Sequence, residues 1–143
     1  MVKFIPFELT LGLRSKILRN GLPLEECIFP TDQVEGAFHL ATYVADEIAS
    51  IASFFPNHYT NHKEFGYQLR GMATDTGFEG KGYGKQLIDF AVIYIKNTNA
   101  QYIWCNARSS AAKFYEKLGF KIVSQEFEIA GIGPHYEMIL NLY

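Results

Sequence analysis

The 143-residue sequence lacks the features that define several protein classes. No apolar run approaches the roughly 18 residues of a membrane span, and the amino terminus shows no signal-peptide pattern. A net charge of −2 provides no overall basic field for nucleic acid. Its two cysteines, Cys27 and Cys105, lack CxxC spacing and should both be reduced, with Cys105 buried. We therefore expect a cytoplasmic protein with no membrane or nucleic-acid partner.

What the chain does contain is typical of a globular protein with an aromatic core. Hydrophobic residues make up 48% of the sequence and charged residues 20%, with 12 Phe and 9 Tyr. No repeat, linker or low-complexity segment interrupts the chain. We expect one domain that covers residues 1–143.

Apolar periodicity predicts a mixed α/β (α+β) fold. The expected strands cover residues 2–9, 38–45, 48–55, 65–73, 101–105, 120–129 and 135–142, with Gly71 as a candidate bulge or a point of close backbone approach. The expected helices cover residues 10–19, 84–95 and 106–118, the first capped by Thr10 and the last closed by Gly119. A hairpin should turn at Asp46-Glu47, and strand 101–105 should run parallel to strand 65–73. The prediction is a single, mostly antiparallel sheet of six to seven strands flanked by helices on both faces.

The most informative segment is the glycine run Glu79-Gly80-Lys81-Gly82-Tyr83-Gly84-Lys85 before the helix at 84–95. Glycines allow close backbone approach, and a helix N-terminus favours an anion such as phosphate. A dinucleotide fingerprint would need glycine where Lys85 or Leu87 stands, and a P-loop would need glycine at Glu79 and Ser or Thr at Gln86. The spacing therefore excludes both of these nucleotide loops.

The run resembles the pyrophosphate loop of the GNAT superfamily of N-acetyltransferases. It matches at Gly82 and Gly84 but has Glu79 where the superfamily has Gln or Arg. The segment Asn106–Phe120 is similar to a later superfamily motif, a strand ending in Asn followed by a helix that carries Phe-Tyr and closes at Gly-Phe. The tail from Gly131 to Met138 resembles the ElaA-like branch.

The resemblance, which runs from about Phe65 to the carboxyl terminus, implies direct transfer of acetyl from acetyl-CoA to an amine of a small molecule, peptide or protein, without a metal. It places Tyr115 as general acid and a backbone N–H near Met72 at the oxyanion. It is also compatible with a homodimer through the C-terminal strands. The CoA-binding residues it implies are Met72, Thr74, Glu79, Gly80, Lys81, Gly82, Tyr83, Gly84, Lys85, Asn106 and Ser109, with Arg108 and Lys113 either at CoA phosphates or on a solvated helix face.

The sequence leaves the general base open among Glu47, Glu64, His135, Glu137 and water, with His135 and Glu137 on one strand face. His58 and His62 have metal-pair spacing but no evident third ligand, so we expect solvated side chains. The acidic residues of the segment 18–35 would suit a cationic amine or a solvated face: Glu25, Glu26, Asp32 and Glu35.

Two other function classes remain compatible with the glycine run. One is a non-catalytic acyl-CoA-binding module, which would keep the loop without productive acid and base groups. The other is a nucleotide-binding or regulatory domain that uses the loop for a different phosphate.

Overall fold

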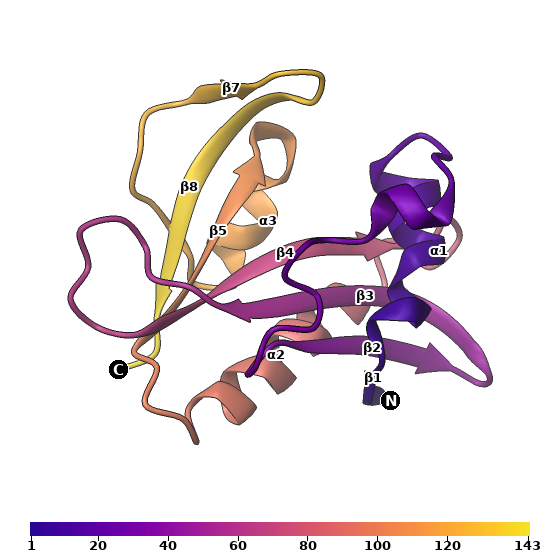
Figure 1. Ribbon diagram of the computed structural model, residues 1–143, viewed down its shortest axis with the longest axis horizontal. Coiled ribbons are helices and arrows are strands. Elements are labelled where there is room, and N and C mark those ends of the chain that lie inside the picture. Colours follow the sequence, from indigo (N-terminus) through magenta and orange to yellow (C-terminus); the bar gives the residue numbers. More distant parts are fainter.

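The computed structural model describes residues 1–143 and contains one eight-stranded sheet (Figure 1). The strands lie in the order β1-β2-β3-β4-β5-β8-β6, and β7 pairs with β8. The strands are β1 (Val2–Ile5), β2 (Phe38–Val44), β3 (Glu47–Pro56), β4 (Gly66–Thr74), β5 (Tyr102–Arg108), β6 (Lys121–Ile122), β7 (Phe127–Ile129) and β8 (Gly133–Asn141). The helical elements are η1 (Phe7–Thr10), α1 (Leu11–Leu13), η2 (Arg14–Leu18), η3 (Leu24–Cys27), α2 (Tyr83–Ile95), η4 (Ser109–Ala111) and α3 (Ala112–Lys117). None of these helices is long and apolar enough to cross a membrane.

The predicted fold class is confirmed. All strand pairs are antiparallel except β4 with β5, which the α2 crossover makes parallel. The sheet has eight strands because the expected strand at 120–129 is interrupted and forms β6 and β7 separately.

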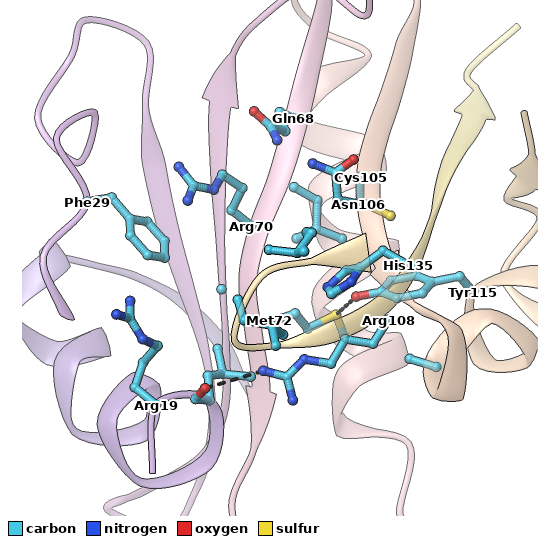
Figure 2. Close-up of a pocket in the computed structure, with 17 residues that line it drawn as sticks. Arg19, Phe29, Gln68, Arg70, Met72, Cys105, Asn106, Arg108, Tyr115 and His135 are labelled. Carbon is cyan, nitrogen blue, oxygen red and sulfur yellow. Dashed lines mark hydrogen bonds between the residues drawn. The ribbon is translucent and has the colours of Figure 1, made fainter. Parts of the chain in front are cut away.

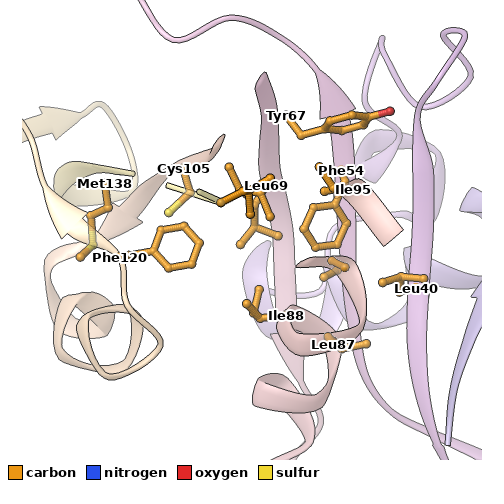
Figure 3. Packing of buried hydrophobic residues seen from close by; sticks show 14 of the residues in the cluster. Leu40, Phe54, Tyr67, Leu69, Leu87, Ile88, Ile95, Cys105, Phe120 and Met138 are labelled. Carbon is orange, nitrogen blue, oxygen red and sulfur yellow. The ribbon is translucent and has the colours of Figure 1, made fainter. Parts of the chain in front are cut away.

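Helices cover both faces of the sheet, as expected from its alternating side chains. On one face, Leu87, Ile88 and Ile95 of α2 pack with Leu40 and Phe54 in the main core (Figure 3). The same core continues to α3 and β8 through Cys105, Phe120 and Met138. On the opposite face, Leu13 of α1 packs against Ala41, Ile51 and Ala73. Consecutive residues of a strand therefore pack into different cores, one on each face of the sheet.

Strands β4 and β5 separate soon after they pair. Their parallel register runs only from Gly66↔Tyr102 to Gln68↔Trp104, and Figure 1 shows β5 and β8 diverging from β3 and β4 beyond that point. In β4, Gly71 and Met72 oppose a single β3 residue, which makes the predicted bulge at Gly71 correct. Gly71 has a φ of 66°, a conformation that glycine adopts without strain.

Thr10 does not cap a helix, contrary to the prediction. Its backbone is already in the right-handed helical region, and its hydroxyl donates to the carbonyl oxygen of Phe7 at 2.6 Å. The helical segment begins three residues earlier because Pro6 ends β1 in an extended conformation.

The predicted helix at 106–118 starts too early. Residues 106–108 continue β5, where Arg108 pairs with His135 of β8, so Asn106 is a strand residue and no helix cap. The end of that helix is as predicted, with Gly119 at a φ of 101°. The hairpin turn is also shifted by one residue, because Glu47 already pairs with Val44 and Ala45 adopts a φ of 53°.

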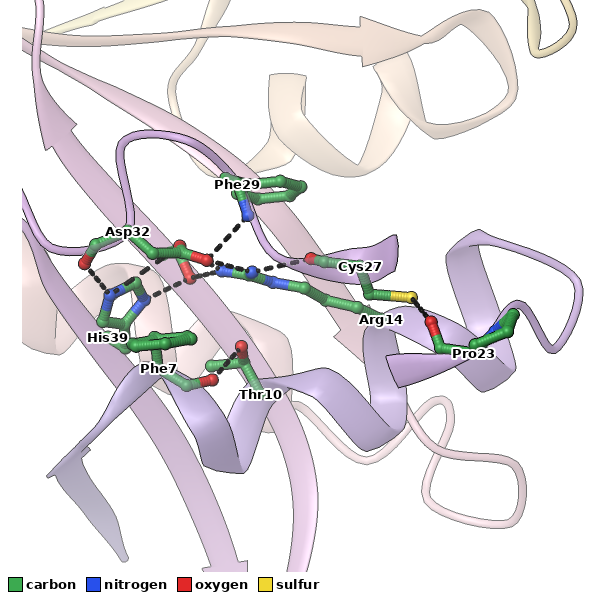
Figure 4. Close-up of polar contacts among 9 residues, drawn as sticks. Phe7, Thr10, Arg14, Pro23, Cys27, Phe29, Asp32 and His39 are labelled. Atoms are coloured by element: carbon green, nitrogen blue, oxygen red, sulfur yellow. Dashed lines mark hydrogen bonds and ion pairs between the residues drawn. The ribbon is translucent and has the colours of Figure 1, made fainter. Parts of the chain in front are cut away.

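A buried ion pair fastens the N-terminal helical segment to the sheet (Figure 4). The Arg14 guanidinium donates to both carboxylate oxygens of Asp32, at 2.7 and 2.8 Å, and to Ser53 Oγ at 2.9 Å. The Arg14 and Asp32 side chains are each 1% exposed. Asp32 is thus neither a solvated residue nor a ligand for a cationic amine, because its carboxylate is already committed to Arg14.

His39 completes this network in its neutral form. Its Nε2 lies 3.0 Å from the carbonyl oxygen of Asp32, which can only accept, so Nε2 carries the proton. Its Nδ1 then accepts from the Ser53 hydroxyl at 2.7 Å. Burial is the main cause that lowers the pKa of His39 below its usual value.

Candidate active site

A cavity of about 270 Å³ lies where β4 and β5 diverge (Figure 2). It is a gap in the sheet, because the splayed strands leave their facing edges unpaired beyond Gln68 and Trp104. β4 and β5 line it with Gln68–Met72 and Cys105–Arg108, and other elements add Leu18, Arg19, Phe29, Ala111, Tyr115, Ile129, Ile132 and His135.

The cavity has two chemically different sides. On the side of α2 and α3, Leu69 and Cys105 belong to the main core, against which Met72 and Tyr115 pack. On the side of the N-terminal helices, Arg70 lies over Phe29. Asn106 and Arg108 point to that second side as well, because strand side chains alternate with those of Cys105 and Ala107.

Met72 and Tyr115 meet on the first side, as Figure 2 shows. The Tyr115 hydroxyl donates to the Met72 sulfur at 3.6 Å, a weak acceptor. Burial, with a smaller contribution from Cys105, raises the pKa of Tyr115 above its usual value. The phenol therefore stays protonated at neutral pH and holds a proton at the cavity.

The Cys105 thiol also borders the cavity but is unreactive. Burial raises its pKa to about 12, so its nucleophilic thiolate form is scarce at neutral pH. Cys105 and Cys27 are both free and Cys105 is buried, as predicted, and Cys27 is buried as well. A reactive acyl group in this cavity would therefore meet no competing thiolate.

The glycine run leads directly into α2 and offers unused donors. The backbone N–H groups from Glu79 to Lys85 donate to no acceptor in the protein. Gly80 and Gly82 have φ values of 72° and 83°, and Gly82 begins α2 without a side-chain cap. Uncapped N–H groups and the helix dipole together make this segment suited to an anion.

The glycine run approaches Met72, a cavity-lining residue, through Gly84. A Cβ atom added to Gly84 would lie 2.8 Å from Met72 Cε, so a larger residue there would displace the Met72 methyl group. Glu79 and Lys81 are exposed, whereas the Lys85 ammonium pairs with Asp89 at 2.6 Å. Met72 therefore contacts both the glycine run and Tyr115.

The structure brings some of the predicted site residues together and leaves others apart. Met72, Asn106 and Tyr115 line the cavity. Thr74 lies beyond the bulge, where it pairs with Ser50. Ser109 is outside the lining, and its hydroxyl donates to Glu126 at 2.7 Å.

Of the four candidate bases, only His135 lines the cavity. Its Nδ1 lies 2.8 Å from the carbonyl oxygen of Gly133 and must donate to it, which leaves Nε2 unprotonated in the neutral ring and without a protein partner. Glu137 instead accepts from the Tyr59 hydroxyl at 2.8 Å, and burial, together with this hydrogen bond, raises the pKa of Tyr59 to about 12. No group of three metal-ligating residues exists around His58 and His62 or elsewhere.

Sequence reasoning missed the arginines of the second side, Arg19 and Arg70, and the aromatic ring of Phe29. The alternation of strand 65–73 could have placed Arg70 on the face opposite Leu69. No local signal could have brought Arg19 and Phe29 to the same cavity, because each comes from an irregular segment.

Comparison with known proteins identifies relatives of the whole chain. The sequence model of the acetyltransferase (GNAT) domain matches residues 29–142. An uncharacterized N-acetyltransferase of Bacillus subtilis strain 168, YitI, is 39% identical over 142 residues, which are 99% of this chain and 95% of that protein.

Solved structures share the fold at low sequence identity. Escherichia coli ElaA superposes with a TM-score of 0.77 at 17% identity, over 98% of this chain and 99% of that one. An aminoglycoside 6′-N-acetyltransferase complexed with coenzyme A superposes with a TM-score of 0.75 at 14% identity, over 100% of this chain and 97% of that one.

Proposed function

This chain belongs to the GNAT acetyltransferase family, whose members use acetyl-CoA to acetylate amines, and from that premise we propose how its own residues perform the reaction. Residues 1–143 form one catalytic unit. Its cavity holds acetyl-CoA on the side of α2 and α3 and admits the amine from the side of the N-terminal helices. The observation that carries this proposal is the position of Met72, which borders the cavity between the glycine run and the Tyr115 hydroxyl.

The co-substrate extends from the glycine run into the gap between the strands. Its pyrophosphate accepts from the backbone N–H groups of Gly80–Lys85, and exposed Lys81 adds positive charge. Its pantetheine arm lies along the β4 edge from Met72 to Thr74, with Asn106 across the gap. Pairing with a strand edge supplies affinity without specific side chains.

Glu79 points away from the phosphates in this arrangement. Its side chain is exposed and makes no ion pair, so solvent screens its repulsion of the pyrophosphate. The backbone N–H groups of the loop then bind the pyrophosphate without help from a side chain at position 79, where the superfamily has Gln or Arg.

Tyr115 and Met72 act at the thioester. Attack by the amine produces a tetrahedral oxyanion, which the Met72 backbone N–H stabilises. Collapse of the intermediate expels the CoA thiolate, and the protonated Tyr115 phenol is the proton donor on that side of the cavity.

His135 accepts the proton that the amine must lose. His135 lines the cavity, and the hydrogen bond from its Nδ1 to Gly133 leaves Nε2 as the acceptor nitrogen of the ring. His135→Gln, measured at saturating acetyl-CoA, should lower kcat about 100-fold or more. A variant with unchanged kcat would return the proton-accepting role to water.

The experiment that tests the function is a screen of amines for thiol release from acetyl-CoA, with acetylated product identified by mass spectrometry. Binding of CoA and of ATP is measured in parallel by calorimetry. Turnover with at least one amine is expected, together with binding of CoA in preference to ATP. Tight CoA binding without turnover of any amine would instead indicate a binding module, and preference for ATP a nucleotide-binding domain.

A further inference from the structure

We propose that the acceptor is an amine that also carries an anionic group, a carboxylate or a phosphate, and that Arg70, assisted by Arg19 and Arg108, binds this group. The inference deepens the proposed function and rests on it. It concerns the side of the cavity that faces the N-terminal helices.

Three arginines from separate elements border the cavity without a counter-charge. Arg19 follows η2, Arg70 lies in β4 and Arg108 ends β5. None forms an ion pair, and no aspartate or glutamate lines the cavity. The polar contact of Arg108 is a hydrogen bond to the Leu18 carbonyl oxygen at 3.3 Å, which leaves its charge uncompensated.

Arg70 is held in place before any ligand arrives. Its guanidinium lies 4.3 Å from the centre of the Phe29 ring, a distance typical of a cation–π contact. Phe29 is fixed in turn by its backbone N–H, which donates to Asp32 at 2.8 Å. Its ring also approaches the bulge, where a Cβ at Gly71 would lie 3.1 Å away. This support reduces the entropy that Arg70 would lose on binding a ligand.

The neighbouring arginine shows why Arg70 suits an anion. Arg14 lies 3.8 Å from the same Phe29 ring, but Asp32 neutralises its charge. Arg70 has no such partner and its side chain is exposed, although partial desolvation and the Arg14 charge lower its pKa from the usual value. An anionic ligand would stabilise the Arg70 cation, and a planar guanidinium binds carboxylate or phosphate through two parallel hydrogen bonds.

These arginines point to the acceptor rather than to CoA. They lie on the face of the sheet opposite Leu69, Cys105 and Tyr115, whereas the glycine run leads into α2 on the latter face. The proposed base His135 shares the arginine face, opposite Arg108 in the register. Positive charge there also lowers the pKa of a bound ammonium, which favours the nucleophilic neutral amine.

The acidic residues of the segment 18–35 do not oppose this inference. Glu25, Glu26 and Glu35 are exposed and line no part of the cavity. Asp32 is paired with Arg14. The charge that an acceptor meets inside the cavity is therefore positive.

The test compares amines of matched length that differ in their second group. An ω-amino acid, its uncharged amide, an aminoalkyl phosphate and a diamine are assayed by thiol release at fixed ionic strength. The kcat/KM of at least one anionic amine should exceed that of the amide about tenfold or more, with the diamine lowest. The order of the carboxylate and the phosphate identifies the anionic group. An amide or diamine that matches or exceeds both anionic amines would overturn the inference.

Variants then locate the effect. Arg70→Gln should lower kcat/KM for the anionic amine about 10- to 100-fold and change that of the amide less than about twofold, because it removes a charge-assisted contact to the anion alone. Lys121→Gln on β6 removes the same charge from an exposed side chain outside the cavity and should change neither value. Equal losses for both amines in Arg70→Gln would contradict the inference.

A binding measurement separates this inference from the proposed function. If no amine is turned over, the proposed function fails, and the same amines are titrated calorimetrically into the CoA-loaded protein. Tighter binding of an anionic amine than of the amide, lost in Arg70→Gln, would still support the arginine site. Equal binding of the amide and the anionic amines would overturn it.

Discussion

Replacement of Tyr115 by phenylalanine should separate catalysis from stability. The only hydrogen bond of the hydroxyl is to the Met72 sulfur, at 3.6 Å, and phenylalanine keeps the ring that packs against Phe120. Because sulfur is a weak acceptor and no cavity forms, the loss in unfolding free energy should be about 0.5 kcal/mol. Loss of the proton donor should lower kcat about 100- to 1,000-fold, equivalent to about 2.7–4.1 kcal/mol of transition-state stabilisation.

The assay measures thiol release with a chromogenic reagent at saturating amine, alongside urea unfolding of the same preparation. Both protein cysteines are buried, so the folded enzyme contributes little background. The dissociation constant of acetyl-CoA should change less than about twofold. Tyr94→Phe, which removes a hydroxyl from α2 outside the cavity, is the control. A kcat for Tyr115→Phe within about threefold of the parent would refute the assignment of Tyr115 as proton donor.

Three further predictions follow from buried contacts. Asp32→Asn should lower the free energy of unfolding, measured in urea, by about 3–5 kcal/mol because it leaves the Arg14 charge unpaired. The double variant Arg14→Met with Asp32→Leu should recover most of that loss, and a loss below about 1 kcal/mol in Asp32→Asn would contradict the prediction. Gly84→Ala should raise KM for acetyl-CoA several-fold by displacing the Met72 methyl, while helix propensity keeps the stability unchanged or higher; an unchanged KM would count against the loop as part of the site. Because the pKa of His39 is lowered in the folded state, the unfolded chain binds the proton first, so stability should fall as pH drops below about 6.5. Urea midpoints measured against pH should show this fall, and the same fall in His39→Gln would assign it to another group.

Local signals were sufficient for the parts of the fold that depend on neighbours in sequence. The α2 helix, the bulge at Gly71 and the left-handed Gly119 each follow from spacing or from the backbone freedom of glycine. The parallel pairing of β4 with β5 follows from the length of the crossover between them. Of these features, α2 and the crossover between β4 and β5 position the glycine run.

Long-range contacts decided the features that the sequence did not reveal. Residues 106–108 look like the start of a helix because Asn106 is a common cap, but pairing with β8 extends the strand. The partners Arg14 and Asp32 are 18 residues apart, and nothing local links them. The positive charge of the proposed acceptor side was missed for the same reason. Arg19, Arg70 and Arg108 are far apart in sequence and line one cavity only because β4 and β5 diverge.

The divergence of β4 and β5 also bears on the order of binding. Their register joins the two parts of the sheet through three residue pairs, beyond which the gap opens to both faces. On the proposed geometry, the bound pantetheine arm forms one wall of the amine site, so that wall is absent until acetyl-CoA occupies the gap. The kinetic consequence is a compulsory sequence in which acetyl-CoA enters first and CoA leaves last, so an amine that arrives early finds only half of its site.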